Sequence, residues 1–393
     1  MMPRIMFVPM SWGRGLGPLT DCLALANELQ KDFDLAFLVK SDFSEFIDQR
    51  RCQIYPITSS ETHKRISQEF YTDFASFQGL DNEDLVRQMM VDEQKAFVDF
   101  KPSVIFSWLQ FTTAITAKLL GITTIARANW PDHVDFIPPP FSVPIQPSKV
   151  TPLFNKLLSE YRMKPISSIW ELSYLRSDFK LAPTLPEFEP ELKKVPNLDY
   201  VGHLVYTGSD ISIEPDWFKD IDKSKSVVYM YLSDKQLDIL DNAEQISEIF
   251  DNTEFQLIIS LGAHVSLTML PPNTKNVRFE RLLPADSILS KSNVFISTGT
   301  RGSTWNALLH GVSMVLFPGI DMEMGFNAQN IERFGAGVRL PDETFLSDQL
   351  LSALRKVNTP DYRKNSWALG EKMRKIGGPR YAADCIRRIA KAQ

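Results

Sequence analysis

Short apolar runs alternate with segments of helical periodicity along nearly the whole chain, and this alternation restricts the fold more than any other feature. An apolar run at residues 4–8 is followed by a glycine-rich loop, and residues 19–29 then carry apolar side chains at helical spacing. The same sequence of features recurs as far as residue 340. Strands that are apolar throughout are typical of parallel sheets covered by helices on both faces. The sequence therefore predicts an α/β fold with doubly wound parallel sheets.

The chain has 393 residues, which favours two domains over a single core. Residues 204–223 contain Gly208 and Pro215 and show little periodicity, so they are the predicted linker. The predicted domains are 1–203 and 224–375, each Rossmann-like, and the last helix, 376–393, is left free to cross back to the first domain. Because ligands in such sheets bind outside the carboxyl ends of the strands, the two domains are expected to face a central cleft.

Helical periodicity also predicts several individual helices. They include helices at 42–49 and 166–175, a longer helix at 82–97, and three helices that close the chain. Three consecutive prolines at 138–140 exclude regular helix there and indicate a stiff, extended segment.

Composition excludes several classes of partner and site. A formal net charge of -5 gives no global basic field, so nucleic acid is not expected as a partner. No stretch approaches the roughly 20 apolar residues of a membrane span, and the first residues are too short an apolar run for a signal peptide. Cys22, Cys52 and Cys385 lie far apart, which argues against disulfides and a zinc site. A cytoplasmic protein without a metal site is predicted.

The strand at 294–297 leads into a turn of small residues, Thr298-Gly299-Thr300-Arg301-Gly302-Ser303, and a helix is expected from about Thr304. The N-terminus of a helix leaves backbone N–H groups without partners and carries the positive end of the dipole, so such a turn binds anions. An acidic loop with Glu323 follows the next strand. Phosphate donors in one turn and a carboxylate in the next would suit a sugar nucleotide, whereas an ordinary turn with ordinary capping is the alternative.

Several motifs in this half of the chain resemble those of GT-B fold glycosyltransferases, most of all the family 1 enzymes that modify macrolide, polyketide and enediyne natural products. The donor signature of that family is matched in position by the turn 298–303 with Asn306-Ala307-Leu308. Its acidic signature falls on 323–328, and 334–340 is close to its usual ending. Near the N-terminus, 15–26 resembles the family's first turn and helix.

The resemblance implies that the C-terminal half binds the donor and the N-terminal half binds the acceptor. It assigns donor binding to Ser233, Leu283, Thr298, Gly299, Thr300, Arg301, Gly302, Ser303, Asn306, Glu323 and Met324. It assigns the acceptor-side loops to Trp12, Gly15, Gly17, Pro18, Trp130 and Asp135.

The sequence departs from the family pattern at four positions. Pro18 stands where the family has its general base, a histidine, and Thr298 stands where a second histidine contacts the pyrophosphate. Asn306 replaces the ribose-binding glutamate, and Glu323-Met324 replaces the sugar-binding Asp-Gln pair. Arg301, if directed at the ligand, would place a permanent charge on phosphate; a solvated surface arginine is the alternative.

An inverting transfer needs the acceptor oxygen to lose its proton, so the missing base must be replaced. By position the candidates are Asp21, one turn beyond Pro18, and His133, which Asp132 and Asp135 could orient. Both also have ordinary interpretations as surface residues. Otherwise the acceptor is itself acidic enough, or the protein is no catalyst.

The sequence thus predicts a metal-independent, inverting glycosyltransferase that uses a nucleoside-diphosphate sugar as co-substrate, requires no cofactor, and acts on a small, fairly apolar acceptor. Two alternatives stay open: a GT-B protein that activates or scaffolds a partner enzyme, and a GT-B epimerase or phosphate-releasing relative. A homodimer is also left open.

Overall fold

The computed structural model describes residues 2–11, 16–60, 68–144, 146–206, 214–232, 236–262 and 265–392. The chain divides into two compact units. The first unit comprises Met1–Ile137, Pro144–Tyr206 and Ile376–Gln393, and the second comprises Pro138–Val143 and Thr207–Lys375. Two predicted site residues near the N-terminus, Trp12 and Gly15, lie outside the described residues, as does Ser233.

The first unit is built on a seven-stranded sheet of order β3-β2-β1-β4-β5-β6-β7, in which every neighbouring pair is parallel. The strand order reverses between β1 and β4, which makes this the switch point where ligands bind in such sheets. The strands are β1 (Arg4–Pro9), β2 (Asp34–Val39), β3 (Cys52–Pro56), β4 (Val104–Trp108), β5 (Thr123–Arg127), β6 (Phe179–Ala182) and β7 (Leu198–Tyr200).

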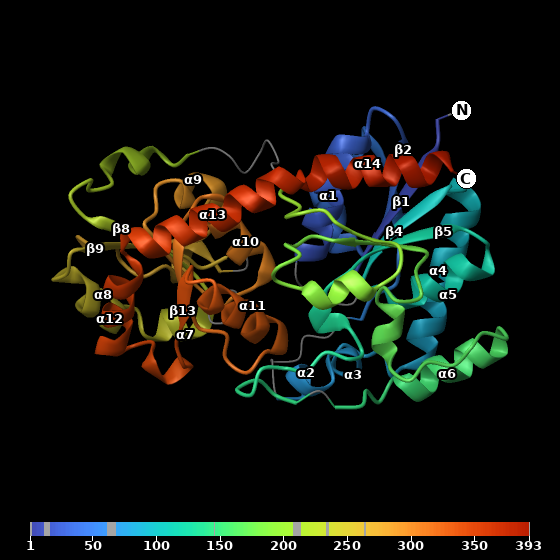
Figure 1. Cartoon of the computed structure of the whole chain (residues 1–393), viewed down its shortest axis with the longest axis horizontal. Helices are drawn as coiled ribbons and strands as arrows, with labels where there is room; N and C mark the ends of the chain where they lie inside the picture. The colour runs from blue at the N-terminus through green and yellow to red at the C-terminus, as the bar shows by residue number, and fades with distance from the viewer. Residues whose placement is uncertain are drawn as a thin grey trace. The chain divides into compact units, whose positions relative to one another are not determined.

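Helices cover both faces of this sheet because its strands are apolar on both sides (Figure 1). Ile5 and Phe7 of β1 point into the core beneath α1 and α14, whereas Met6 and Val8 point into the core beneath α4 and α5. The helices of the unit are α1 (Gly17–Leu29), α2 (Gln68–Thr72), α3 (Phe74–Phe77), α4 (Glu83–Phe100), α5 (Phe111–Leu119), α6 (Thr151–Glu160) and α14 (Gly378–Lys391).

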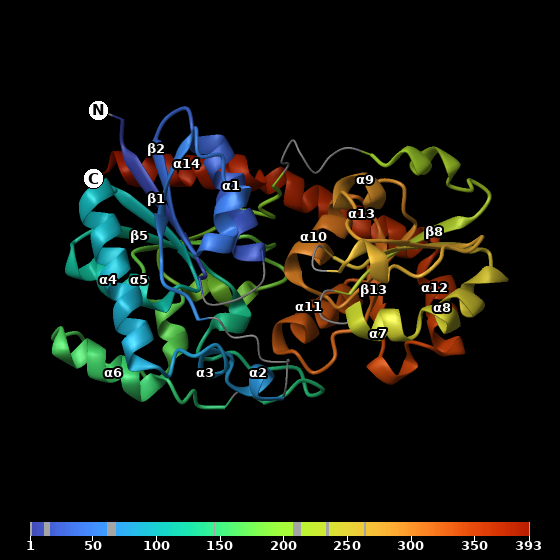
Figure 2. The ribbon, with the colours of Figure 1, turned by 180° about the vertical axis from the view of Figure 1, so that it is seen from behind.

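The last helix, α14, packs along α1 although more than 300 residues of sequence separate them, as both ribbon views show (Figures 1 and 2). Ile386 of α14 and Leu25 of α1 share one core. Arg387 adds a hydrogen bond from its Nε to Asp32 Oδ2 (2.8 Å). The end of the chain is therefore an integral layer of the first unit.

The second unit contains a six-stranded parallel sheet of order β10-β9-β8-β11-β12-β13. Its strand order reverses between β8 and β11, so the turn that follows β11 leaves the sheet at the switch point. The strands are β8 (Ser226–Tyr231), β9 (Phe255–Ser260), β10 (Val277–Glu280), β11 (Val294–Ser297), β12 (Ser313–Leu316) and β13 (Gly337–Arg339).

The helices of the second unit are α7 (Gln236–Asp241), α8 (Ala243–Asp251), α9 (Ala285–Leu289), α10 (Arg301–Leu309), α11 (Met322–Arg333), α12 (Asp348–Val357) and α13 (Pro360–Ile376). One core lies between the sheet and the helices α8 and α12, and it includes Ile296 of β11, Phe250 of α8 and Leu354 of α12. Two parallel sheets with helices on their faces confirm the predicted α/β fold class.

Two predicted helices are wrong. Residues 42–49 form only a short 3₁₀ segment, Ser41–Phe46, because Ile47 is extended and Asp48 turns back to pair with Arg50. Residues 166–175 likewise contain only the 3₁₀ segment Ile169–Leu172. There the hydroxyl of Ser168 caps Trp170 N–H, and hydrogen bonds from Ser167 hold Glu171. Local side-chain bonds of this kind compete with a continuing helix.

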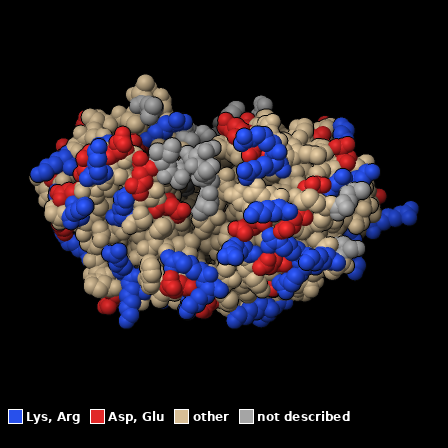
Figure 3. Space-filling view, turned by 90° about the horizontal axis from the view of Figure 1, so that it is seen from above, with Lys and Arg blue, Asp and Glu red and all other residues tan. Residues whose placement is uncertain are grey.

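Among the described residues, no helix is long and apolar enough to cross a membrane. On the face drawn in Figure 3, Lys and Arg side chains are interspersed with Asp and Glu side chains.

Candidate functional site

The turn between β11 and α10 is shaped by Gly299. This residue has φ of 93°, in the left-handed region that favours glycine. A Cβ at Gly299 would lie 3.0 Å from the backbone oxygen of Met324, so the close approach of α11 requires glycine as well. The turn is thus built around one residue that no other type replaces without strain.

The helix α10 begins three residues earlier than the predicted Thr304. Thr300 is extended, and the N–H of Thr304 donates to the Thr300 carbonyl (3.0 Å), which makes Arg301, Gly302 and Ser303 the first three helical residues. Their N–H groups belong to the set that a helix cannot satisfy internally. The predicted anion site therefore has the geometry of a helix N-terminus, with Gly302 exposed above it.

Hydrogen bonds of side-chain hydroxyl groups stabilise the turn. The Ser303 hydroxyl is hydrogen-bonded to the Thr300 hydroxyl and lies 3.4 Å from that of Ser297. The Ser297 hydroxyl also accepts a hydrogen bond from Gly299 N–H (3.2 Å), and Thr298 is buried. These hydrogen bonds fix the shape of the predicted anion-binding turn.

The N-terminal turn of α11 is tied to the same place. Asn327 is buried, and its Nδ2 donates to the Gly299 carbonyl (2.9 Å). Asp321 caps the helix by accepting a hydrogen bond from Met324 N–H (2.8 Å). The structure thus brings the predicted phosphate turn and the predicted sugar-binding loop together, and Asn327 is one link between them.

Arg301 and Glu323 form an ion pair, with Nε of Arg301 3.5 Å from Oε1 of Glu323. The Arg301 side chain is only 4% exposed, so it is not the solvated surface arginine considered above. Its guanidinium lies 5.7 Å from the ring of Trp305, and Glu323 retains 37% exposure. Arg301 therefore orients Glu323 while placing a positive charge at the start of α10.

Two further predicted donor residues lie near α10. Asn306 is half-buried, and its side-chain oxygen accepts no hydrogen bond from the residues that the structure describes. Leu283 is buried just before α9. The helix α9 is held to the end of α10 by a hydrogen bond of 2.9 Å between Asp286 and His310.

The first base candidate, Asp21, is buried on α1. Its Oδ2 lies 2.8 Å from Nε of Arg127, at the end of β5, and the guanidinium of Arg127 covers the ring of Trp108 at 3.7 Å. Gly17 and Pro18 form the first turn of α1, with Pro18 buried. Asp21 is thereby part of a buried ion pair beside the switch point of the first sheet.

The second base candidate, His133, is stacked on Trp130 with ring centroids 4.6 Å apart. Its Nδ1 accepts a hydrogen bond from the backbone N–H of Asp135 (3.0 Å). Burial lowers the pKa of His133, although the carboxylate of Asp135 acts in the opposite direction. The ring is therefore neutral at pH 7, and with Nδ1 as acceptor the proton resides on Nε2.

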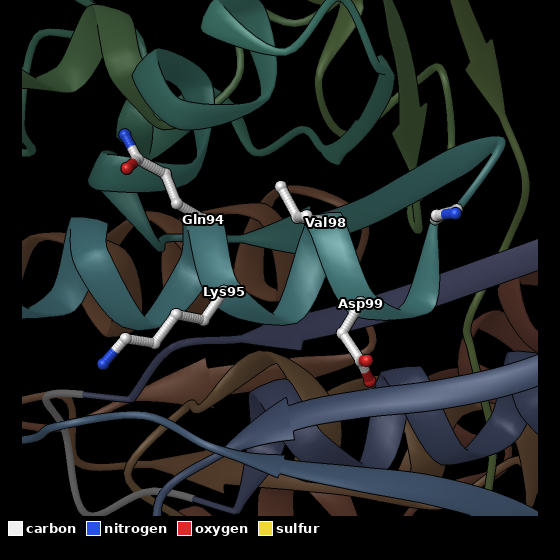
Figure 4. A pocket seen from close by; sticks show the side chains of 5 residues that line it. Gln94, Lys95, Val98 and Asp99 are labelled. Carbon is white, nitrogen blue, oxygen red and sulfur yellow. The ribbon is translucent and has the colours of Figure 1, made fainter.

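A surface pocket lined by Gln94, Lys95, Val98, Asp99 and Lys101 lies on α4 (Figure 4). None of the predicted site residues lines it. Within the described residues, no group of three or more His, Cys, Asp or Glu side chains is arranged to hold a metal ion.

The chain is similar in sequence to known glycosyltransferases and to one described protein family. Residues 244–386 match the family described as erythromycin biosynthesis protein CIII-like, C-terminal domain. A PGL/p-HBAD biosynthesis glycosyltransferase of Mycobacterium tuberculosis is 21% identical over 339 residues, covering 80% of this chain and 77% of the relative.

Two solved structures show the same fold. The glycotransferase of kitacinnamycin has a TM-score of 0.76 at 19% identity and covers 98% of this chain and 99% of its own. A spinosyn rhamnosyltransferase complexed with thymidine diphosphate has a TM-score of 0.71 at 14% identity, covering 98% and 99%. The predicted resemblance is confirmed: the chain has the GT-B fold of these glycosyltransferase structures, and its residues 244–386 are similar to the erythromycin biosynthesis protein CIII-like C-terminal domain.

Proposed function

We propose that the protein transfers a sugar from a nucleoside diphosphate to a small, fairly apolar acceptor, with inversion at the anomeric carbon and without a metal ion. The observation that carries the proposal is the junction of the β11–α10 turn with the start of α11. It combines the N–H groups at the N-terminus of α10, the Arg301–Glu323 pair and the Asn327 bond to Gly299 within one unit.

The diphosphate is the part of the donor that the turn suits. As the bond to the sugar breaks, negative charge develops on the leaving phosphate, and the N–H groups of residues 301–303 with the helix dipole stabilise it. Arg301 adds a buried positive charge at the same end of α10. These groups supply the electrostatic role that a divalent cation takes in other transferases, which supports a metal-independent reaction.

The sugar and ribose are assigned to neighbouring side chains. Glu323 presents a half-exposed carboxylate that can accept hydrogen bonds from sugar hydroxyls, and Asn306 offers an amide to a ribose hydroxyl. Met324 stands where the family pattern has an amide side chain, and its thioether suits a sugar that lacks a hydroxyl group.

Both candidate bases for removal of the acceptor proton are engaged in other contacts. Asp21 is engaged with Arg127, and His133 accepts on Nδ1, so its Nε2 carries a proton. These contacts favour acceptors whose hydroxyl is itself acidic, such as phenols, because such a group needs little help from a base.

Product analysis tests this function. The protein is incubated with UDP- and dTDP-sugars and a panel of phenolic and aliphatic alcohol acceptors, with and without EDTA, and products are detected by mass spectrometry. A glycosylated phenol that forms equally with EDTA, with an inverted anomeric configuration by NMR, is expected. Loss of product with EDTA would reject the metal-independent reaction, and a retained configuration would reject inversion.

The scaffold and epimerase alternatives gain no support from the relatives and structures described above. A control without acceptor separates the second of them, since only an epimerase converts one sugar nucleotide into another.

A further inference from the structure

The segment Pro138–Val143 follows β5 and the His133 loop of the first unit in sequence, yet it belongs to the second unit. Its backbone forms a tight turn, in which Ser142 N–H donates to the Pro139 carbonyl (2.9 Å). The consecutive prolines restrict its conformations before it docks. We name Pro138–Val143 the proline strap.

The proline strap is hydrogen-bonded to the loop that precedes α11. Val143 N–H donates to the Ile320 carbonyl (3.0 Å), and the Ser142 hydroxyl donates to the Asp321 carbonyl (3.1 Å). Two neighbouring residues of the strap thus hold two neighbouring carbonyls of the loop. Asp321 is also the residue that caps α11.

A glycine within α11 makes room for the strap. A Cβ at Gly325 would lie 2.5 Å from the Ser142 hydroxyl oxygen and 3.0 Å from Cε2 of Phe141. Glycine inside a helix is unfavourable relative to alanine, and Gly325 does not have the positive φ that would require it. The contact with the strap is therefore the reason for glycine at this position.

Phe141 also contacts the end of β13. The guanidinium of Arg339 lies 3.9 Å from the centroid of the Phe141 ring, a cation–π contact. The ring is thereby held between Arg339 and the first turn of α11. That turn carries Glu323, whose carboxylate is paired with Arg301.

We propose that the proline strap is a positioning element for the donor sugar: it fixes the first turn of α11 so that Glu323 is held where it can bind sugar hydroxyls. Phe141, Ser142 and Gly325 act on the sugar through Glu323. This inference rests on the proposed sugar-nucleotide function. It implies that the strap contributes to the binding of the sugar, and not to that of the bare nucleotide.

Calorimetric titration separates the two contributions. The full chain is titrated with UDP and UDP-glucose, and with dTDP and dTDP-glucose, and the pair that binds more tightly is used for the variants. Phe141→Ala removes the ring contacts, and Gly325→Ala adds a Cβ that would displace the strap, so each is expected to weaken sugar-nucleotide binding roughly tenfold. Their dissociation constants for the bare nucleotide should stay within about twofold of the wild type.

Matched variants make the test specific. Phe46→Ala removes a phenylalanine that is 42% exposed in the first unit, and it should change neither constant. Phe141→Tyr retains the ring and should restore sugar-nucleotide binding. Combining Phe141→Ala with Glu323→Ala should cost no more than Glu323→Ala alone, because both changes remove the same interaction.

Three outcomes would overturn the proposal. They are unchanged sugar-nucleotide affinity in Phe141→Ala, an equal loss of bare-nucleotide affinity, and additive effects in the double variant. A wild-type chain that binds UDP or dTDP but none of the sugar nucleotides more tightly would likewise overturn the strap's role. A wild-type chain that binds neither nucleotides nor sugar nucleotides would instead contradict the proposed function itself.

Discussion

The Oδ2 atom of Asp21 lies 2.8 Å from Nε of Arg127, and the two side chains are only 10% and 3% exposed. Such a pair forms across 106 residues of sequence, between the first helix and the end of β5. Removing one partner of a buried pair leaves an uncompensated charge, so the pair identifies Asp21 as a residue on which the fold depends.

Asp21→Asn is therefore expected to lower the free energy of unfolding by about 3–5 kcal/mol, because Arg127 stays buried without its counter-charge. Asp34→Asn, which removes the exposed partner of Arg4, is the control and should cost less than about 1 kcal/mol. Urea unfolding measures both. If Asp21→Asn keeps wild-type stability but loses about 10²–10⁴-fold in turnover, Asp21 is the general base and the structural interpretation is wrong.

The environment of His133 predicts its titration. Burial against Trp130 lowers the pKa of His133 below the usual 6.5, so the unfolded chain takes up this proton before the folded chain does. The contribution of His133 to stability is accordingly full above pH 6.5 and declines as the pH falls through that value. NMR titration of the ring proton, assigned with His133→Gln, measures the pKa, and Trp130→Ala should raise it. A wild-type pKa above 6.5 would contradict the buried neutral ring.

Glu93 gives the opposite pH dependence. This carboxyl is fully buried on α4, where it accepts hydrogen bonds from Thr112 and Thr113, and burial raises its pKa from 4.5 to about 7. Between these values the folded state binds the proton that the unfolded state releases. The stability contributed by the neutral carboxyl is therefore full below pH 4.5 and is lost as the pH rises through 7.

Glu93→Gln keeps a neutral side chain at every pH. The change that it causes in the free energy of unfolding should therefore be more favourable at pH 8 than at pH 5, by up to about 3 kcal/mol. Thermal unfolding at both pH values measures this difference. Glu244→Gln, at an exposed position in the first turn of α8, is the control and should show no such difference. A Glu93→Gln effect that is the same at pH 5 and pH 8 would contradict the raised pKa.

Gly299 and Gly302 predict a contrast within one turn. Gly299→Ala introduces a Cβ 3.0 Å from a backbone oxygen at φ of 93°, which should cost about 1–3 kcal/mol of stability. Gly302→Ala has no atom within 4 Å of its Cβ and lies in the first turn of α10, so it should be neutral or slightly stabilising. Thermal unfolding of both variants tests the geometry, and equal effects would contradict it.

The sequence predicted the strands well because each is a short apolar run that is buried on both faces, as in β11 and β12. It also predicted a turn of small residues between β11 and a following helix, since Gly299 and Ser303 belong to a local pattern. The start of α10 was placed too late because the capping geometry at Thr300 depends on hydroxyl contacts that periodicity does not show.

Other parts of the site depend on contacts between distant residues. No residue near Asp21 in the sequence indicates that it pairs with Arg127. The one available signal was the position of Arg127, a charged residue at the carboxyl end of an apolar strand. The prolines at 138–140 predicted a stiff segment but not the unit in which it packs. Asn327 belongs to the acidic signature 323–328, but the sequence does not show that its side chain is hydrogen-bonded to Gly299.

The most direct test of the central claim is calorimetric titration of the wild-type chain and Glu323→Ala with a panel of UDP- and dTDP-sugars. We predict that at least one sugar nucleotide binds to the wild type more tightly than its bare nucleotide does, and that Glu323→Ala removes this difference. Failure of every sugar nucleotide in the panel to bind the folded wild-type protein would contradict it.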